Sequence, residues 1–402
     1  MPEAAQEPPY AWVVVWATFG ALALIFGVAY SFAAFFEAFV NEFQAKRADV
    51  SLVYGLMGGV YFAGGAFAGL LADRVGPRMV AAAGMLCIAA GLWASSLAES
   101  MQGIYAAYGL GLGVGVALVY TPVMANVPPW FSRRRGLASG VASAGIGAGT
   151  LVLPLLATWA ITAWQWRGAS RAIALAVLLL GLVSAWLLRR APMATVQPGA
   201  WAPGASLGQA LRSTDFHSLY AVCVLASPAM CVPWAHGSAA ARDLGVPAAQ
   251  AVGLVGLIGV GSLVGRFAIG GLADRVGRPQ TLALTLASMG LSFGLWLVAG
   301  GYTALAGFAL WMGLSYGGIV CLLPALCMDL FGARAVAAIL GTLYTGAAVG
   351  NLFGPWLAGA AFDRLGSYAP VVWVCASGCG LAMLAALRLA RSMAMRATTV
   401  PT

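Results

Sequence analysis

The chain consists of long apolar segments separated by short stretches that carry nearly all of its charged residues. A helix needs about 20 apolar residues to cross the hydrocarbon core of a membrane. Cutting the sequence at its charges gives twelve segments of suitable length. They cover residues 11–38, 51–71, 80–97, 103–128, 136–162, 171–189, 216–241, 248–271, 281–299, 303–328, 335–360 and 370–390. The pattern predicts an all-α membrane protein with twelve transmembrane helices.

The composition supports this prediction and excludes a soluble protein. Of the 402 residues, 61% are hydrophobic and 8% are charged, whereas an average soluble domain is about 25% charged. The net charge of +9 does not indicate a nucleic-acid partner, because the cations lie singly or in threes between apolar segments. All seven cysteines lie inside apolar segments without the neighbours that a zinc site needs. We therefore expect a lipid environment, no disulfide framework, no metal and no cofactor.

Signatures of enzymes are weak in this chain. Residues 204–208 match G-x-S-x-G, but no strand precedes them and no triad partners accompany them. The sequence has no Walker loop, no H-E-x-x-H motif and no dinucleotide fingerprint. These observations argue against an enzyme and against a pump that uses ATP directly.

The two halves of the chain repeat each other. Residues 71–76 read L-A-D-R-V-G and recur as residues 272–277, at an offset of 201. The stretch 191–214 is the one long polar interruption, and it divides the segments six and six. We therefore predict two pseudo-symmetric six-helix bundles, at 1–190 and 215–402, joined by a cytoplasmic linker at 191–214.

The distribution of Lys and Arg predicts the orientation. Counted over alternate loops, fourteen cations fall on one side and six on the other, with Arg266 inside a segment. Because cytoplasmic loops carry the excess of positive charge, both termini are predicted to be cytoplasmic. We expect a multi-pass protein of the inner (plasma) membrane.

Three motifs resemble a known transporter family. Gly69–Arg78 resembles the loop motif G-x-L-x-D-R-x-G-x-R of the major facilitator superfamily, and a second copy runs from Gly270 to Arg278. Phe131–Gly140 resembles the start of the fifth helix in the monocarboxylate transporter family. His236 and the pair Gly265-Arg266 resemble the pattern in helices 7 and 8 of its bacterial members and of the related oxalate/formate antiporter. The resemblance implies the major facilitator fold and transport by alternating access.

The resemblance also implies a gating role for the two loop motifs. In the superfamily such groups form ion pairs between helices that hold the outward-facing state and break on inward opening. The residues to which this role is carried over are Asp73, Arg74, Arg78, Asp274, Arg275 and Arg278.

The chain departs from the family's pattern at three positions. Animal members carry an acid four residues before the helix-8 arginine and a lysine in helix 1, where Ser262 and Ala34 stand here. The oxalate antiporter has a second cation in helix 11, where Ala347 stands here. One fixed positive charge remains, which favours a monoanion over a dianion as the substrate.

Arg266 is the leading candidate for substrate binding. It lies eight residues before Asp274, so a helix places it about 12 Å deeper in the membrane, near the midplane. A guanidinium there costs at least about 2.5 kcal/mol, and its planar fork suits a carboxylate. The counterpart in the first repeat is Gly65, so the fold does not require the charge. The alternative is an arginine that reaches the cytoplasmic face or bonds helix carbonyls.

Hydroxyl and amide groups complete the predicted site. Tyr120 and Tyr316 lie in matched glycine-rich helices, and a tyrosine hydroxyl can donate to a carboxylate or hold the arginine in place. Tyr30, Tyr344 and Asn351 are candidates for the same role, although tyrosines near helix ends also serve as interfacial anchors.

His236 is the predicted carrier of a proton. No Asp or Glu lies at the middle of any apolar segment, and histidine changes its charge near neutral pH. His236 follows Pro228 and Pro233, which are expected to kink the helix and expose its backbone to a cavity. The alternative is an ordinary interfacial histidine.

These observations predict a secondary transporter that moves a small monocarboxylate, most simply a lactate-like or pyruvate-like anion. The family resemblance implies that a proton moves with it, and we expect a monomer to be the functional unit. The open alternatives are an organic anion exchanger of the oxalate/formate type and a non-transporting membrane sensor on the same fold. A multidrug antiporter is disfavoured, because a cationic drug is better served by a buried acid.

Overall fold

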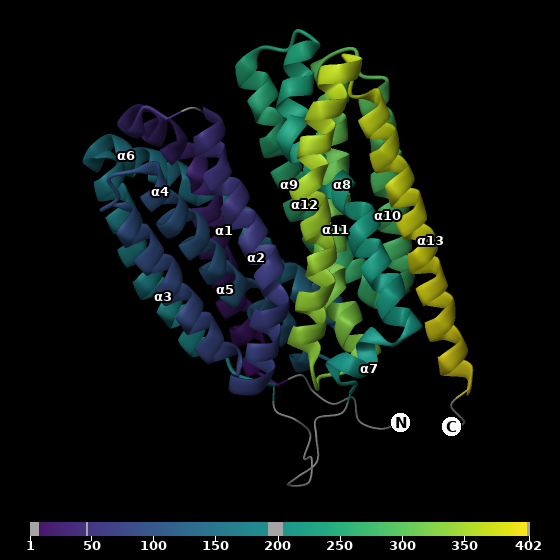
Figure 1. Ribbon diagram of the computed structural model, residues 1–402. Helices are drawn as coiled ribbons and strands as arrows, with labels where there is room; N and C mark the ends of the chain where they lie inside the picture. The colour runs from purple at the N-terminus through teal and green to yellow at the C-terminus, as the bar shows by residue number, and fades with distance from the viewer. Residues whose placement is uncertain (1–7, 46, 192–203, 400–402) are drawn as a thin grey trace. The chain divides into compact units, whose positions relative to one another are not determined.

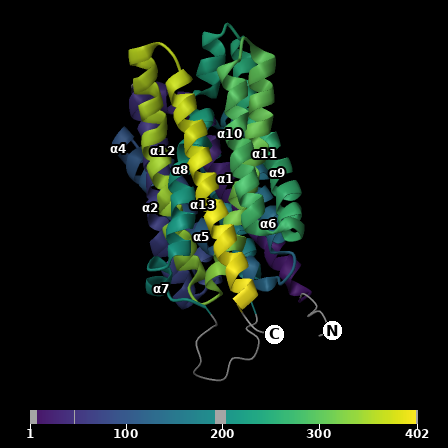
Figure 2. The same ribbon diagram turned by 90° about the vertical axis from the view of Figure 1, so that its right-hand side faces the viewer.

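A computed structural model of the chain describes residues 8–45, 47–191 and 204–399, and these form helices with no strand among them. The elements are α1 (Tyr10–Phe43), α2 (Arg47–Val75), α3 (Pro77–Ser95), α4 (Met101–Ile104), the π-helix η1 (Tyr105–Gly111), α5 (Leu112–Asn126), the 3₁₀ turn η2 (Pro128–Trp130), α6 (Arg135–Leu187), α7 (Leu207–Leu211), α8 (Thr214–Asp243), α9 (Ala248–Val276), α10 (Arg278–Leu297), α11 (Tyr302–Phe331), α12 (Val336–Leu365) and α13 (Ala369–Thr399). Figures 1 and 2 show long helices that lie side by side. The predicted all-α class is confirmed.

The described residues contain ten helices that are long and apolar enough to cross a membrane. The 53-residue α6 is one of them, but Gln165 inside it has φ 58° and ψ 170°, so this helix comprises two spans. The apolar part of α12, Val336–Asn351, is shorter than the others. Counting α6 as two spans and α12 as one gives the twelve that the sequence predicts.

The chain forms two compact units, and each takes a short segment from the other half of the sequence. Unit 1 comprises Met1–Ser132, Val141–Pro203 and Ala333–Thr342, and unit 2 comprises Arg133–Gly140, Gly204–Gly332 and Leu343–Thr402. The beginning of α6 therefore belongs to unit 2, and the beginning of α12 belongs to unit 1. Half of the predicted linker, residues 192–203, lies outside the described residues, and its described part contains α7.

Unit 1 is held together by close helix contacts at small residues. The helices α2 and α3 both pack on α5. A Cβ added at Gly145 or Gly149 of α6 would overlap the backbone carbonyl of Phe19 or Ala23 on α1. Such close approach is the role that a pair of small residues four apart plays between membrane helices. Gly145 and Gly149 therefore allow the backbones of α1 and α6 to pack closely.

Unit 2 contains further close contacts between helix backbones at glycines. The helices α9 and α11 pack along their length, and α13 packs on both α8 and α10. Gly265 of α9 lies against the backbone of Leu314, and Gly317 of α11 lies against the backbone of Ser262. Because neither glycine carries a Cβ, the two backbones approach closely and bring their neighbouring side chains together. This contact positions the residues around Arg266.

A methyl group at Gly149 is expected to destabilise the protein. Gly149→Ala adds a Cβ that overlaps the carbonyl of Ala23, and overpacking of this kind costs about 1–3 kcal/mol. Gly256→Ala is the matched control, because no atom lies within 4 Å of a Cβ added there. Both variants gain the same helix propensity. Unfolding in detergent should show a loss of stability for Gly149→Ala and none for Gly256→Ala, and equal behaviour of the two variants would contradict the packing described here.

Candidate functional site

Arg266 lies in the middle of α9 and is 1% exposed. Its Nε donates a hydrogen bond of 3.2 Å to the hydroxyl of Ser262, one turn earlier on the same helix. The residues that flank it in the sequence are uncharged, and its low exposure places the side chain in the protein interior. Burying a cation is costly unless other groups compensate it. The structure therefore buries the Arg266 side chain.

Tyr316 and Cys321 of α11 lie near Arg266. The close contact between α9 and α11 brings these side chains together across the two backbones. The ring of Tyr316 also contacts the ring of Trp234 on α8, edge to face, at 5.8 Å between centroids. Of the predicted hydroxyl partners, Tyr316 is therefore beside Arg266 in the same unit.

The beginning of α6 crosses α9 at Arg266. A Cβ added at Gly140 would overlap the backbone carbonyl of Arg266. The counterpart crossing lies in unit 1, where Gly65 of α2 contacts the backbone of Gly341 on α12. Both members of this second crossing are offset by 201 residues from those of the first. The same helix crossing thus forms with glycine at position 65, so the packing does not demand an arginine at position 266.

Tyr120 and Tyr30 belong to an aromatic cluster in unit 1. The ring of Tyr120 lies edge to face with Phe26 at 5.2 Å and with Tyr61 at 6.4 Å. Tyr30 stacks on Phe26 at 6.3 Å and lies 6.4 Å from Tyr54. The sequence analysis overlooked Tyr54 and Tyr61. Their seven-residue spacing, which places them on one face of α2, is the sequence signal from which they could have been identified.

The two candidates on α12 differ in exposure. Tyr344 is 4% exposed and therefore lies in the interior. Asn351 is exposed, and its side-chain amide donates to the carbonyl of Ala347 on the same helix at 3.1 Å. Both lie in the part of α12 that belongs to unit 2.

His236 pairs with a residue that the sequence analysis did not identify. Its Nδ1 lies 3.2 Å from the hydroxyl of Tyr368, which precedes α13. The ring of Tyr368 stacks on Phe362 at 4.4 Å and lies 6.2 Å from Trp296. A proton carried by the imidazole therefore has a hydroxyl as its immediate neighbour. No signal in the sequence links positions 236 and 368.

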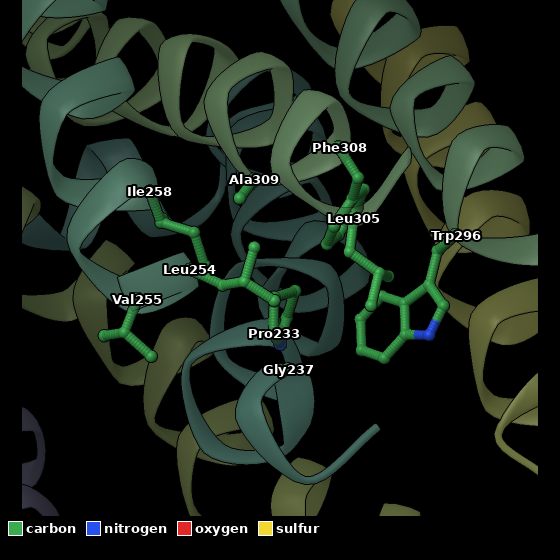
Figure 3. A pocket seen from close by; sticks show the side chains of 9 residues that line it. All are labelled: Pro233, Gly237, Leu254, Val255, Ile258, Trp296, Leu305, Phe308 and Ala309. Carbon is green, nitrogen blue, oxygen red and sulfur yellow. The ribbon is translucent and has the colours of Figure 1, made fainter. Parts of the chain in front are cut away.

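A small apolar pocket lies in unit 2, beside Pro233 and Gly237 of α8 (Figure 3). Its lining residues come from α8, α9, α10 and α11, and they are Pro233, Gly237, Leu254, Val255, Ile258, Trp296, Leu305, Phe308 and Ala309. None of them is charged, so this pocket suits apolar groups rather than a carboxylate. Within the described residues, no group of three His, Cys, Asp or Glu side chains could hold a metal ion.

The second loop motif forms a network of ion pairs in unit 2. The carboxylate of Asp274 accepts hydrogen bonds of 2.9 Å from the backbone N–H groups of Gly136 and Leu137 in the first turn of α6. A carboxylate is favourable there, because a helix N-terminus carries partial positive charge. Arg278 pairs with Asp274 at 2.7 Å and with Asp329 at 2.6 Å.

Asp329 extends this network to a fourth member. It also forms a salt bridge with Arg135 at the start of α6. The network therefore joins α9, α10 and α11 to the N-terminus of α6. Asp329 was not predicted from the sequence, because it lies outside the loop motif. Arg275 belongs to the motif, but its side chain is exposed.

The first loop motif forms a simpler contact in unit 1. Asp73 accepts hydrogen bonds from the N–H groups of Ala337 and Ala338 in the first turn of α12, at 3.3 and 2.9 Å. This repeats the contact of Asp274 at an offset of 201. Arg78, however, donates to the carbonyl of Leu188 at 3.0 Å. Pro77 separates Arg78 from the glycine of its motif, whereas Arg278 follows its glycine directly, and this shift of one position accounts for the different partner.

Comparison with known proteins gives a consistent result. The profile described as "Major Facilitator Superfamily" matches residues 17–341 and 218–399. Monocarboxylate transporter 13 of Bos taurus is 32% identical over 367 residues, which cover 90% of this chain and 86% of that protein. Monocarboxylate transporter 3 of Rattus norvegicus is 30% identical, with 90% and 77% covered.

Two solved structures share the fold. The crystal structure of the human organic anion transporter MFSD10 has a TM-score of 0.77 at 16% identity, covering 95% of this chain and 100% of that chain. The E. coli fucose:proton symporter FucP has a TM-score of 0.74 at 14% identity, covering 95% and 98%. These similarities establish the fold and say nothing of the substrate.

The two loop motifs are expected to differ in how much they contribute to the stability of the protein. Asp274→Asn removes the ion pair with Arg278 as well as the charge at the N-terminus of α6, whereas Asp73→Asn removes the charge at the N-terminus of α12. Because a charge-assisted hydrogen bond contributes about 1.5–3 kcal/mol, we expect Asp274→Asn to lose about 2 kcal/mol more stability than Asp73→Asn. Unfolding in detergent measures this, with the exposed Asp243→Asn as the control. Equal losses of stability in Asp73→Asn and Asp274→Asn would contradict this difference between the two motifs.

Proposed function

The chain belongs to the major facilitator superfamily, in which it is a transporter related to the monocarboxylate transporters, and from this premise we propose that it carries a small organic monoanion across the membrane together with a proton. The observation that carries the proposal is the burial of Arg266 in α9. The repeat forms the same helix crossing around Gly65. A costly charge that packing does not require is explained by a ligand of opposite charge.

The substrate carboxylate binds the guanidinium of Arg266. Two parallel N–H···O bonds fit the planar fork of arginine, which makes a carboxylate a better partner than a single-point anion. Tyr316, which lies near Arg266 on α11, donates its hydroxyl to the same carboxylate. Tyr120 and Tyr30 of unit 1, with Tyr344 and Asn351 of unit 2, are the proposed further contacts.

The bound monoanion neutralises the buried cation. A carboxylate and a guanidinium together have no net charge, so the loaded site costs less to enclose than the empty one. With Ala347 in the place of a second cation, a dianion would leave one negative charge without compensation. This charge balance favours a monocarboxylate such as lactate or pyruvate over a dicarboxylate such as oxalate.

His236 carries the proton in this proposal. Its imidazole lies beside the hydroxyl of Tyr368, which holds the ring in one orientation and gives the proton a route along a hydrogen bond. The proton enters from water on the side of higher proton concentration and leaves to water on the other side. Transport is thereby driven by the proton gradient without a covalent intermediate.

The two loop motifs serve as gates. Asp73 with Arg74 and Arg78, and Asp274 with Arg275 and Arg278, occupy one end of their helices, where the charges hold the first turns of α12 and α6. Releasing these contacts frees both helices to move as the transporter changes state. We further propose that this end and both termini face the cytoplasm, that the membrane is the plasma membrane, and that the monomer is the functional unit.

Substitution of Arg266 tests the proposed substrate site. Uptake of radiolabelled L-lactate, pyruvate and acetate is measured in proteoliposomes with an inward proton gradient. Arg266→Gln should abolish uptake, and Arg266→Lys should reduce it at least about tenfold, because lysine keeps the charge but lacks the fork. The exposed Arg242→Gln in the same unit is the control and should transport normally. Normal uptake by Arg266→Gln would remove Arg266 from the site.

Substitution of His236 tests the proton coupling separately. His236→Gln should lose the stimulation by the proton gradient while keeping exchange of labelled for unlabelled substrate at equal pH, because exchange needs no net proton movement. Tyr368→Phe, which removes the hydroxyl but keeps the ring, should weaken the stimulation in the same assay. Unchanged stimulation in His236→Gln would assign the proton to another group. A wild type that exchanges anions but shows no gradient-driven uptake would favour the exchanger of the oxalate/formate type.

A further inference from the structure

We propose that unit 1 binds the headgroup of an anionic phospholipid, such as phosphatidylglycerol, where Arg78, Arg189 and Arg190 meet at the end of α6, with the acyl chains lying along the exposed apolar side chains of α3 and α6. The proposal is independent of the transported substrate. It rests on how these arginines are held and on what surrounds them.

Arg189 and Arg190 follow the end of α6, Arg78 contacts the same stretch, and none of the three forms a salt bridge with a described carboxylate. Arg78 donates to the carbonyl of Leu188 at 3.0 Å. Arg190 donates to the carbonyls of Ala72 and Asp73, at 3.1 and 2.7 Å. The guanidinium carbon of Arg189 lies 4.4 Å from the ring centroid of Tyr10. Carbonyl oxygens and an aromatic ring fix the positions of these cations but do not neutralise them.

The balance of charge at this end of unit 1 is positive. Arg74, which is exposed, adds a fourth cation. The acid that the described residues bring there is Asp73, whose oxygens accept from two N–H groups of α12. Among the described residues at the ends of α2 and α6 and the start of α3, these four arginines exceed the one carboxylate by three charges. The matching end of unit 2 differs in pairing, because Arg278 forms salt bridges with two carboxylates, whereas its counterpart Arg78 donates to a backbone carbonyl.

An exposed apolar surface begins beside these cations. Trp186 of α6 is 65% exposed, and its ring centroid lies 6.0 Å from the guanidinium carbon of Arg78. Val183, one turn earlier, is 58% exposed, and Met79 in the first turn of α3 is 63% exposed. Tryptophan is enriched at the depth of lipid headgroups. The change from apolar surface to arginine over one turn therefore matches the boundary between acyl chains and headgroups.

A phospholipid is the ligand that fits both features. Its phosphate suits arginine, which binds planar pairs of anionic oxygens, and its acyl chains cover the apolar side chains that continue from the same site. A free phosphate uses the cations but leaves the apolar surface unexplained. A zwitterionic lipid brings its own cation to a site that is already positive. An anionic phospholipid is attracted by about 1 kcal/mol for each arginine near the surface, which corresponds to about fivefold in affinity.

Native mass spectrometry of the purified full-length protein tests the proposal. The protein in detergent is incubated with equal amounts of dioleoyl phosphatidylglycerol and dioleoyl phosphatidylcholine, and the lipid retained in the gas phase is counted. Wild type should retain phosphatidylglycerol in preference to phosphatidylcholine. Arg189→Gln, which removes the cation that lies over the ring of Tyr10, should reduce the retained phosphatidylglycerol about fivefold. The double variant Arg78→Gln/Arg189→Gln should reduce it further.

Arg388→Gln, which removes an exposed arginine of α13 in unit 2, is the matched control and should retain the lipid as wild type does. If the double variant fails to fold, Arg189→Gln alone decides, because it leaves the hydrogen bonds at the end of α6 intact. The proposal is overturned by equal retention of the two lipids, by normal retention in Arg189→Gln, or by an equal loss in Arg388→Gln. Displacement of the lipid by an equal concentration of soluble glycerol phosphate would assign the site to phosphate rather than to a lipid.

Discussion

The burial of the Arg266 guanidinium in an apolar membrane helix is the constraint on which the account of the site depends. Its side chain is 1% exposed, and a cation at this depth costs at least about 2.5 kcal/mol. Ser262, one turn earlier on α9, accepts a hydrogen bond from the Nε of Arg266. Tyr316 of α11 lies near Arg266 because glycines let α9 and α11 approach closely. The packing of unit 2 therefore serves to hold one charge in a fixed place.

The repeat explains why this charge is informative. Asp73 and Asp274 each accept hydrogen bonds from two backbone N–H groups, in the first turns of α12 and α6. The two pairs of N–H groups are equivalent at an offset of 201 residues. The two copies differ where one has Gly65 and the other has Arg266. They differ again where the Arg278 copy pairs with Asp329 while Arg78 binds a carbonyl. Symmetry accounts for the scaffold, and the departures from it mark the residues available for function.

The sequence predicted the helices well because the bilayer imposes their length and composition. It placed Arg266 in the interior, since an arginine inside an apolar segment has few alternatives. It could not find Asp329 or Tyr368, because each makes its contact with a residue from a distant segment, Asp329 with Arg278 and Tyr368 with His236. It also missed the exchange of residues 133–140 and 333–342 between the two compact units. That exchange depends on which backbones pack together, which periodicity does not record.

The most direct test of the central claim is an experimental structure of the protein with a bound monocarboxylate. The account predicts density for the carboxylate within about 3 Å of the Arg266 guanidinium, with the Tyr316 hydroxyl as a second partner. A carboxylate bound elsewhere, with Arg266 contacting protein groups alone, would contradict it.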